Sequence, residues 1–107
     1  MIKRICEDHI PECVGVIKSS FVTVADALGF TPDNAPRFTA FATTEDRLKY
    51  QMFVEKKPMF AYFDGDVIAG YYSLALNDKG ECELNNLCVL PGYRHKGIGS
   101  ALLDHAF

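Results

Sequence analysis

Residues 88–103 read Cys-Val-Leu-Pro-Gly-Tyr-Arg-His-Lys-Gly-Ile-Gly-Ser-Ala-Leu-Leu, and this stretch decides the fold. A predicted strand ends before the Pro–Gly pair at 91–92, and a predicted helix begins near Gly97. The first amides of a helix lack partners within it and lie at the positive end of its dipole. Gly97 and Gly99 leave those amides uncovered, and the basic run 94–96 adds positive charge. The stretch therefore predicts a cradle for a phosphate or pyrophosphate group.

Two other glycine-rich phosphate loops fit this stretch poorly. A P-loop requires the string G-x-x-x-x-G-K-[ST], which the sequence does not contain. The dinucleotide fingerprint G-x-G-x-x-G requires a third glycine where Leu102 stands, and it belongs to a parallel β-α-β unit. The predicted cradle follows strands that are joined by short turns instead.

The hydrophobic pattern before the cradle predicts a series of strands and two earlier helices. An Asp–Gly pair at 64–65 is a strong hairpin signal, and a second turn is expected at 77–80. Gly70 inside a strand indicates either a β-bulge or a close approach of another part of the chain. In chain order we expect a strand at 2–6, a helix ending at Gly29, a link at 29–43, a helix from about 44 to 56, strands at 59–63, 67–76 and 81–90, and a helix at 97–107.

The first predicted helix carries one apolar stripe. Asp8 is its expected N-cap and Gly29 its expected C-cap, while Thr43 or Thr44 is expected to cap the second helix. The stripe repeats every three or four residues, which is typical of a helix that packs against a core. Its members are Ile10, Val14, Ile17, Phe21, Val24 and Leu28.

The predicted order is strand, helix, helix, strand, strand, strand, helix. This order indicates an α+β fold with a mostly antiparallel central sheet and flanking helices. With 107 residues and no internal repeat, residues 1–107 are expected to form a single domain. The link at 29–43 is long for a small domain, and links of this length are often functional.

The composition is that of a globular chain. Hydrophobic residues make up 49% and charged residues 23%, which excludes disorder. A net charge of −3 argues against a general nucleic-acid surface. The apolar runs are too short to cross a membrane, and the charged N-terminus is unlike a signal peptide. We therefore expect a cytoplasmic protein that binds neither nucleic acid nor membrane.

The sequence has four cysteines, which are expected to be free and mostly buried. No C-x-x-C pair occurs, and no histidine stands at zinc-ligand spacing from a cysteine pair, so no metal is expected. The cysteines are Cys6, Cys13, Cys82 and Cys88.

The motif Arg94-x-x-Gly97-x-Gly99, preceded by a strand ending Leu-Cys-Val-Leu-Pro at 87–91, resembles the acetyl-coenzyme A signature of the GNAT N-acetyltransferase superfamily. The order of elements is similar to that fold over nearly the whole chain, and residues 83–103 carry the specific part. The resemblance implies a GNAT-like acyl-CoA N-acyltransferase fold with acetyl-CoA as co-substrate. It also implies acetyl transfer to a primary amine of a small molecule or peptide, by direct attack of the amine.

The resemblance further implies which residues bind acetyl-CoA. The main chain of Leu87, Cys88 and Val89 would hydrogen-bond the pantetheine arm. Arg94 would shape the loop that follows. The backbone amides that would hold the pyrophosphate belong to His95, Lys96, Gly97, Ile98, Gly99 and Ser100.

Glu83 is the expected catalytic base, because several family members carry a glutamate four residues before the position of Leu87. A solvated strand carboxylate is the alternative, and Asn85 is another candidate for orienting a water or the acceptor. Cys88 is expected to be a packed thiol, not a nucleophile. Strand alternation is expected to place Glu83, Asn85, Leu87 and Val89 on one face, and Cys82, Leu84, Asn86 and Cys88 on the other.

In this family the acceptor site is partly built from the link between the first two helices. The resemblance therefore implies a role for residues 30–43, among them Asp33, Arg37 and Phe38. Three tyrosines of the middle strands could line the same site, with a core role as the alternative for each. They are Tyr62, Tyr71 and Tyr72.

Family members continue beyond this last helix with a fifth strand, a further helix and usually two more strands. A tyrosine after the fifth strand often protonates the leaving thiolate. None of these follows residue 107, so we expect an incomplete, C-terminally truncated domain. Two hypotheses stay open: an N-acetyltransferase, or a non-catalytic acyl-CoA-binding form whose open strand edge pairs with a second copy in a homodimer.

Overall fold

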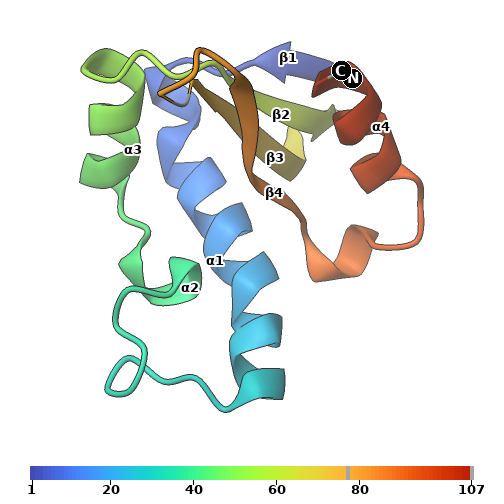
Figure 1. Ribbon diagram of the computed structural model, residues 1–107. Helices are drawn as coiled ribbons and strands as arrows, with labels where there is room; N and C mark the ends of the chain where they lie inside the picture. Colours follow the sequence, from blue (N-terminus) through green and yellow to red (C-terminus); the bar gives the residue numbers. More distant parts are fainter. Residues whose placement is uncertain (77, 107) are drawn as a thin grey trace.

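A four-stranded antiparallel sheet in the order β1-β2-β3-β4 forms the centre of the molecule (Figure 1). The coordinates are a computed structural model that describes residues 1–76 and 78–106. The strands are β1 (Ile2–Arg4), β2 (Met59–Asp64), β3 (Val67–Leu76) and β4 (Cys82–Val89). The expected α+β fold with an antiparallel central sheet is confirmed.

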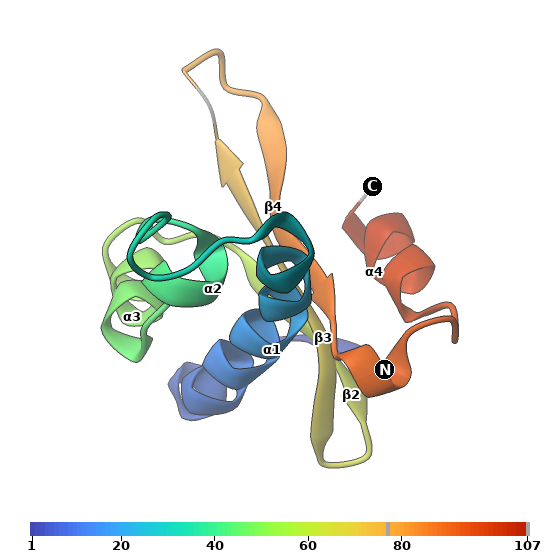
Figure 2. The same ribbon diagram turned by 90° about the horizontal axis from the view of Figure 1, so that it is seen from below.

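Helices cover both faces of the sheet, with α1, α2 and α3 on one side and α4 on the other (Figure 2). Their bounds are α1 (Ile10–Leu28), α2 (Thr39–Ala42), α3 (Glu45–Phe53) and α4 (Ile98–Ala106), with 3-10 turns at Glu7–His9 and Pro91–Tyr93. The predicted order is confirmed, and α2 is an addition within the link. The predicted turn at 77–80 and helix at 97–107 include Asn77 and Phe107, which lie outside the described residues.

Each face of the sheet has its own hydrophobic core. On the α1 face the largest buried side chains are Ile10, Ile17, Leu48, Met59, Ile68 and Tyr71. On the α4 face the buried residues are Ala69, Tyr72, Ile98 and Leu102. Tyr71 and Tyr72 are both buried in these cores, which favours the core role over a place in an acceptor site.

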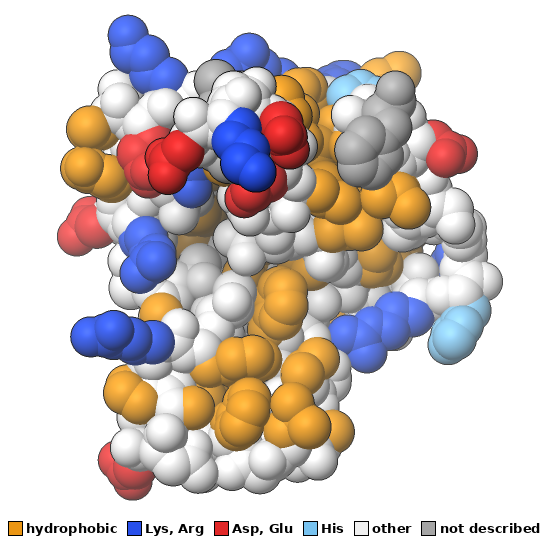
Figure 3. Space-filling view, viewed as in Figure 1, with side chains coloured by type: hydrophobic (Ala, Val, Ile, Leu, Met, Phe, Trp, Pro, Cys, Tyr) orange, Lys and Arg blue, Asp and Glu red, His pale blue; other side chains and the backbone are white. Residues whose placement is uncertain are grey.

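Helix α1 packs on the sheet through its N-terminal half only. Ile10 and Ile17 are fully buried, as the stripe predicts, but Val24 is 41% exposed and Leu28 is 61% exposed. Figure 1 shows why: the C-terminal half of α1 extends past the sheet and lies beside α2. Figure 3 shows hydrophobic side chains gathered over this part of the molecule.

The helix ends follow local capping rules, with one correction. Asp8 is not the N-cap, because a 3-10 turn precedes α1 and the Cys6 amide donates to His9 Nδ1 at 3.0 Å. Gly29 ends α1 with a φ of 72°, a left-handed conformation that favours glycine. Thr44 caps α3, since its Oγ1 accepts from the Arg47 amide at 3.1 Å.

A β-bulge interrupts β4 and reverses the predicted alternation. Tyr71 pairs with Cys88 and Ser73 pairs with Asn85, so two residues of β4 stand opposite Tyr72 alone. Asn86 lies in this bulge with a φ of 55°. Glu83 and Asn85 therefore share the α1 face with Cys88, whereas Leu84, Leu87 and Val89 pack on the α4 face. The expectation that Glu83 and Asn85 share a face with Leu87 and Val89 is wrong, because that expectation contained no bulge.

The helices and the ionisable side chains limit which environments and ligands the described residues suit. Among residues 1–76 and 78–106, none of the helices combines the length and the hydropathy needed to cross a bilayer, and no group of His, Cys, Asp and Glu side chains is arranged to hold a metal ion. All four cysteines are free thiols. Cys13 and Cys88 are buried, but Cys6 and Cys82 are exposed, so the expectation of mostly buried thiols holds for only half of them.

Candidate functional site

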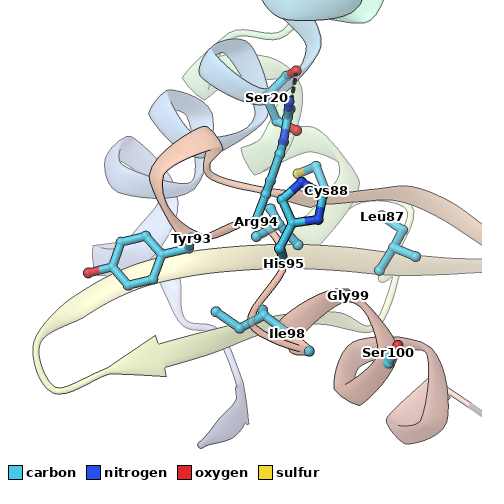
Figure 4. A pocket seen from close by; sticks show the side chains of 11 residues that line it. Ser20, Leu87, Cys88, Tyr93, Arg94, His95, Ile98, Gly99 and Ser100 are labelled. Carbon is cyan, nitrogen blue, oxygen red and sulfur yellow. Dashed lines mark hydrogen bonds between the residues drawn. The ribbon is translucent and has the colours of Figure 1, made fainter.

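A cavity of about 420 Å³ opens where β4 ends, between the start of α4 and helix α1 (Figure 4). It brings together nine of the ten residues that the sequence singled out for acetyl-CoA, with Lys96 the exception. These nine are Leu87, Cys88, Val89, Arg94, His95, Gly97, Ile98, Gly99 and Ser100. Ser20 of α1 and Tyr93 complete the lining, and the sequence reasoning missed both.

The N-terminus of α4 supplies backbone donors to this cavity. The first helical hydrogen bond of α4 runs from the Ala101 amide to the Gly97 carbonyl, at 3.0 Å. The three amides before it, from Ile98 to Ser100, have no acceptor inside the helix. Together with the positive end of the helix dipole, they favour an anion in the cavity.

Gly97 keeps the approach to these amides open. Its φ is 79°, which an L-residue adopts only at a cost, and a Cβ placed on it would meet no heavy atom within 4 Å. A side chain there would therefore extend into open space in front of the helix end. Gly99 is closer to its surroundings, since its Cβ would lie 3.8 Å from Val89 Cγ2.

Arg94 fastens the loop to α1. Its Nη2 donates to the Ser20 carbonyl and to Thr23 Oγ1, each at 3.1 Å. Thr23 Oγ1 in turn donates to the same carbonyl at 2.8 Å. Figure 4 shows the Arg94 side chain reaching from the loop toward Ser20, so its guanidinium forms one wall of the cavity. Arg94 acts on the cavity by positioning the loop.

The remaining loop side chains point in different directions. Lys96 does not line the cavity, and its Nζ lies 5.4 Å from the centre of the Tyr93 ring, a cation–π distance. A hydrogen bond to the Asp64 carboxylate raises the pKa of the Tyr93 hydroxyl above its usual value. His95 has a φ of 67° and lines the cavity. Of the three basic residues, Arg94 and His95 therefore line the cavity, and Arg94 brings it a positive charge.

Gly70 sets the position of α4 on the sheet. A Cβ at Gly70 would lie 2.8 Å from Leu102 Cδ1 and 3.2 Å from the Cys88 carbonyl oxygen. The same glycine pairs with Val89 across β3 and β4. The close approach predicted at this strand glycine is therefore confirmed, and it brings α4 directly against the end of β4.

Cys88 lines the cavity but is a buried thiol. Burial raises its pKa to about 12, although a backbone hydrogen bond with Tyr71 and the charge of Arg94 act in the opposite direction. A thiol with this pKa is protonated at neutral pH and is a poor nucleophile. The structure thus supports the expected packing role for Cys88.

Glu83 lies outside this cavity. It pairs with Ala75 across the β3–β4 ladder and is exposed on the α1 face. Asn85, two residues further along, shares that face. The bulge at Asn86 thus separates the residues proposed for chemistry from Leu87 and Val89, which line the cavity.

The sequence held a signal for one of the two missed residues. Tyr93 lies inside the quoted motif, between the strand stop and Arg94, so its place in the loop was available from the sequence. Ser20 is 74 positions from Arg94 and reaches the cavity only through the fold. Ser20 is a buried residue of α1 whose carbonyl accepts from Thr23, and nothing in the sequence marks it as functional.

A family model described as the acetyltransferase (GNAT) family matches residues 27–107. The chain belongs to the GNAT family. The match spans the link, the middle strands and the whole of the motif at 88–103. The GNAT resemblance that the motif predicted is therefore confirmed at the level of the family.

Solved structures of GNAT proteins share this fold. The PaiA N-acetyltransferase of Thermoplasma acidophilum, crystallised with coenzyme A, has a TM-score of 0.83 at 17% identity, over 99% of this chain and 68% of its own. The ribosomal-protein-S18-alanine N-acetyltransferase of Escherichia coli has a TM-score of 0.69 at 19% identity, over 99% and 56%. A GNAT acetyltransferase of Brucella melitensis, crystallised with acetyl-CoA, has 0.68 at 16%, over 99% and 64%.

These identities are low, so the likeness to solved structures shows the shared fold. The chain spans between about half and two thirds of the length of these three proteins. A search of curated proteins finds no match to this GNAT chain.

Proposed function

We propose that this GNAT domain transfers an acetyl group from acetyl-CoA to a primary amine of a small molecule or peptide. One observation carries the proposal: the cavity at the end of β4 opens onto the uncovered N-terminal amides of α4. Membership of the GNAT family and the likeness to proteins crystallised with coenzyme A or acetyl-CoA support it.

The residues around the cavity fit acetyl-CoA. Its pyrophosphate is an anion, and the amides from His95 to Ser100, with Lys96 among them, would donate to it. The main chain of Leu87, Cys88 and Val89 would hydrogen-bond the pantetheine arm, because β4 pairs only with β3 among the described residues. Arg94 would hold the loop in place through its bonds to α1.

The proposed reaction is direct transfer. Acetyl-CoA supplies an activated thioester, and a neutral amine attacks its carbonyl carbon. The amine loses one proton, and coenzyme A leaves as a thiol after gaining one. Glu83 is the proposed base, because it lies on the α1 face with Asn85, where an amine could approach β4. A water between Glu83 and the amine would bridge the gap that its exposed position leaves.

A second candidate function is acyl-CoA binding without catalysis, coupled to dimerisation. The observation that favours it is the outer edge of β4, which has no neighbouring strand in the described part of the chain. A second copy that pairs along this edge would form a homodimer. In either case we propose a cytoplasmic protein without a metal cofactor, which acts on neither nucleic acid nor membrane.

The first experiment is a calorimetric titration of the 107-residue chain with acetyl-CoA and, separately, with coenzyme A. The proposal expects saturable binding of both. Release of the coenzyme A thiol is then followed in the presence of a panel of primary amines, with boiled protein as the control. Binding without turnover by any amine would favour the second candidate, and light scattering would then show whether the chain is a dimer. A folded chain that binds neither compound would contradict both candidates.

A further inference from the structure

A second, smaller cavity lies on the α1 face of β4, between the strand and the segments that form α2 and α3. Its volume is about 210 Å³, which corresponds to about seven water molecules in the liquid at roughly 30 Å³ each. This is the size of a small metabolite. The lining residues come from five separate stretches of the chain: Arg37, Thr39, Ala42, Thr43, Arg47, Leu48, Gln51, Lys57, Asn85 and Asn86.

The charged residues that line this cavity are all basic. Arg37, Arg47 and Lys57 line it, and among the residues that the structure describes no aspartate or glutamate does. Glu55 lies 3.9 Å from the Lys57 ammonium group, at the outer limit of an ion pair. Figure 3 shows Lys and Arg side chains beside α2 and α3 on the face that it presents. In a protein of net charge −3, this concentration of positive charge favours an anionic ligand.

Gln51 adds an unused acceptor to the cavity wall. The residue is 8% exposed, and its Oε1 is buried with no hydrogen-bond partner. An unpaired buried polar atom destabilises a fold. Gln51 Oε1 is covered in this side-chain conformation, so a turn of the side chain into the cavity would offer this acceptor to a ligand N–H, such as that of an amine.

The second cavity and the candidate acetyl-CoA cavity are lined by consecutive residues of β4. Asn85 and Asn86 line the second cavity, and Leu87, the next residue, lines the first. Consecutive Cα atoms are about 3.8 Å apart, so a ligand in the second cavity lies beside the strand segment proposed to hold the thioester arm. The bulge at Asn86 is the boundary between the two cavities.

We infer that the second cavity binds the acetyl acceptor, and that this acceptor is a small primary amine that also carries an anionic group. Arg37, Arg47 and Lys57 bind the carboxylate or phosphate, and Gln51, with its side chain turned into the cavity, accepts an N–H from the amine through Oε1. The inference rests on the proposed function for the identity of the reaction. The binding chemistry of the cavity can be tested separately.

The test compares amines that differ only in the anion. Each standard L-amino acid is paired with its α-carboxamide, and phosphoethanolamine is paired with ethanolamine. Calorimetry measures binding to the 107-residue chain with and without coenzyme A, and thiol release measures acetyl transfer. The inference expects at least one acidic member to bind about tenfold or more tightly than its neutral partner. The pair that shows the difference distinguishes a carboxylate ligand from a phosphate ligand.

Three variants assign the effect to this cavity. Arg47→Gln is expected to raise the Kd of the acidic ligand about tenfold and to leave that of its neutral partner unchanged. Lys49→Gln is the matched control, because it removes the same charge from α3 without touching the cavity. Gln51→Leu is expected to weaken binding of the amine while the melting temperature stays equal or rises, because an unpaired buried acceptor is removed.

The outcomes separate this inference from the proposed function. Tight binding of an acidic amine without binding of acetyl-CoA would uphold the inference about the cavity and contradict the proposed reaction. Acetyl transfer with no preference for any acidic member over its neutral partner would overturn the inference and leave the proposed function standing. The inference also fails if no acidic member binds, or if Lys49→Gln and Arg47→Gln weaken binding equally.

Discussion

The two ends of β4 present different kinds of atoms to the cavities beside them. Beyond the bulge, Val89 leads into a loop and a helix start whose backbone amides face the larger cavity. Before the bulge, Asn85 contributes to a smaller cavity whose remaining lining is mainly side chains from α2, α3 and the segment after α3. One end is thus built from backbone and glycine, and the other from charged and amide side chains.

This difference determines which ligand features each end can recognise. Backbone amides at a helix end bind an anion whatever the neighbouring side chains are, provided that nothing covers them. A cavity that is lined by side chains changes its ligand preference when one of those side chains is substituted. We therefore expect substitutions beyond the bulge to affect affinity for the shared co-substrate, and substitutions before it to affect the acceptor or the rate.

The largest expected effect is that of Gly97→Val. The valine side chain would extend into the space in front of the α4 amides, and its β-branch is poorly tolerated at a φ of 79°. We expect the affinity for coenzyme A to fall by roughly a thousandfold, about 4 kcal/mol. Calorimetry measures this loss, and a melting curve measures stability.

Gly65→Val is the matched control for this substitution. Gly65 has a similar φ of 61°, lies in the β2–β3 turn and also has no neighbour within 4 Å. Both variants should lose a similar amount of stability, but only the Gly97 variant should lose coenzyme A. If both variants bind coenzyme A equally well, Gly97 does not face the ligand.

Glu83→Gln is expected to have the next largest effect, on the opposite end of the strand. If Glu83 takes the proton of the amine, the rate of acetyl transfer should fall by about a hundredfold, within the range for general bases. The affinity for acetyl-CoA should stay the same, because Glu83 lies outside the larger cavity. The measurement is a pH–rate profile with a calorimetric titration beside it. A profile that is the same in the variant and the natural chain would remove Glu83 from the reaction.

Arg94→Gln is expected to have a smaller effect. It removes the two hydrogen bonds that Arg94 makes to α1, so the loop loses its attachment while the helix amides stay in place. We expect coenzyme A affinity to fall about tenfold, as for the loss of a charged hydrogen bond. Thr23→Val removes only one of these contacts and should have the weaker effect. Equal effects from the two variants would show that the Ser20 carbonyl contributes nothing.

The smallest effect on function is expected from the buried thiols. Burial raises the pKa of Cys13 and of Cys88 to about 12, from 9.0 in each case. Unfolded chains release these protons above pH 9, whereas the folded chain retains them until about pH 12. The free energy of unfolding should therefore fall as the pH rises between these values. Denaturant titrations at pH 8 and pH 10 measure the change.

Alkylation with iodoacetamide at pH 8 checks the same assignment. Only the exposed Cys6 and Cys82 should react in the folded chain, and Cys88 should react after unfolding. Rapid labelling of Cys88 in the folded chain would contradict a packing role and would show that a reactive thiol lies at this end of β4.

The fold and the backbone end of the site were predictable from the sequence because their constraints are local. Glycine is favoured at position 97 because the backbone has a positive φ there, and at position 70 because Leu102 comes close. Both requirements can therefore be recognised in the sequence as glycines. The strands from Met59 to Val89 are marked by turn residues and apolar runs. Local backbone requirements select particular residue types, and these can be recognised without the fold.

The side-chain end was not predictable because its constraints are not local. Arg37, Arg47, Lys57 and Asn85 are far apart in the sequence and meet only when α2 and α3 pack beside β4. The bulge at Asn86 reversed the assigned faces, although an Asn–Asn pair inside an apolar strand was a signal, since Asn tolerates a positive φ. Strict alternation has no place for an extra residue.

The extra residue in β4 acts as a phase shift between two stretches of one strand. If β4 kept Asn86 but lost the bulge, strict alternation would turn Glu83 and Asn85 to the α4 face, away from the basic cavity, in a single step. With the bulge present, the stretch before it can exchange side chains without altering which way Leu87 to Val89 point. One strand can thus keep the same co-substrate at the end beyond the bulge while the acceptor changes at the end before it.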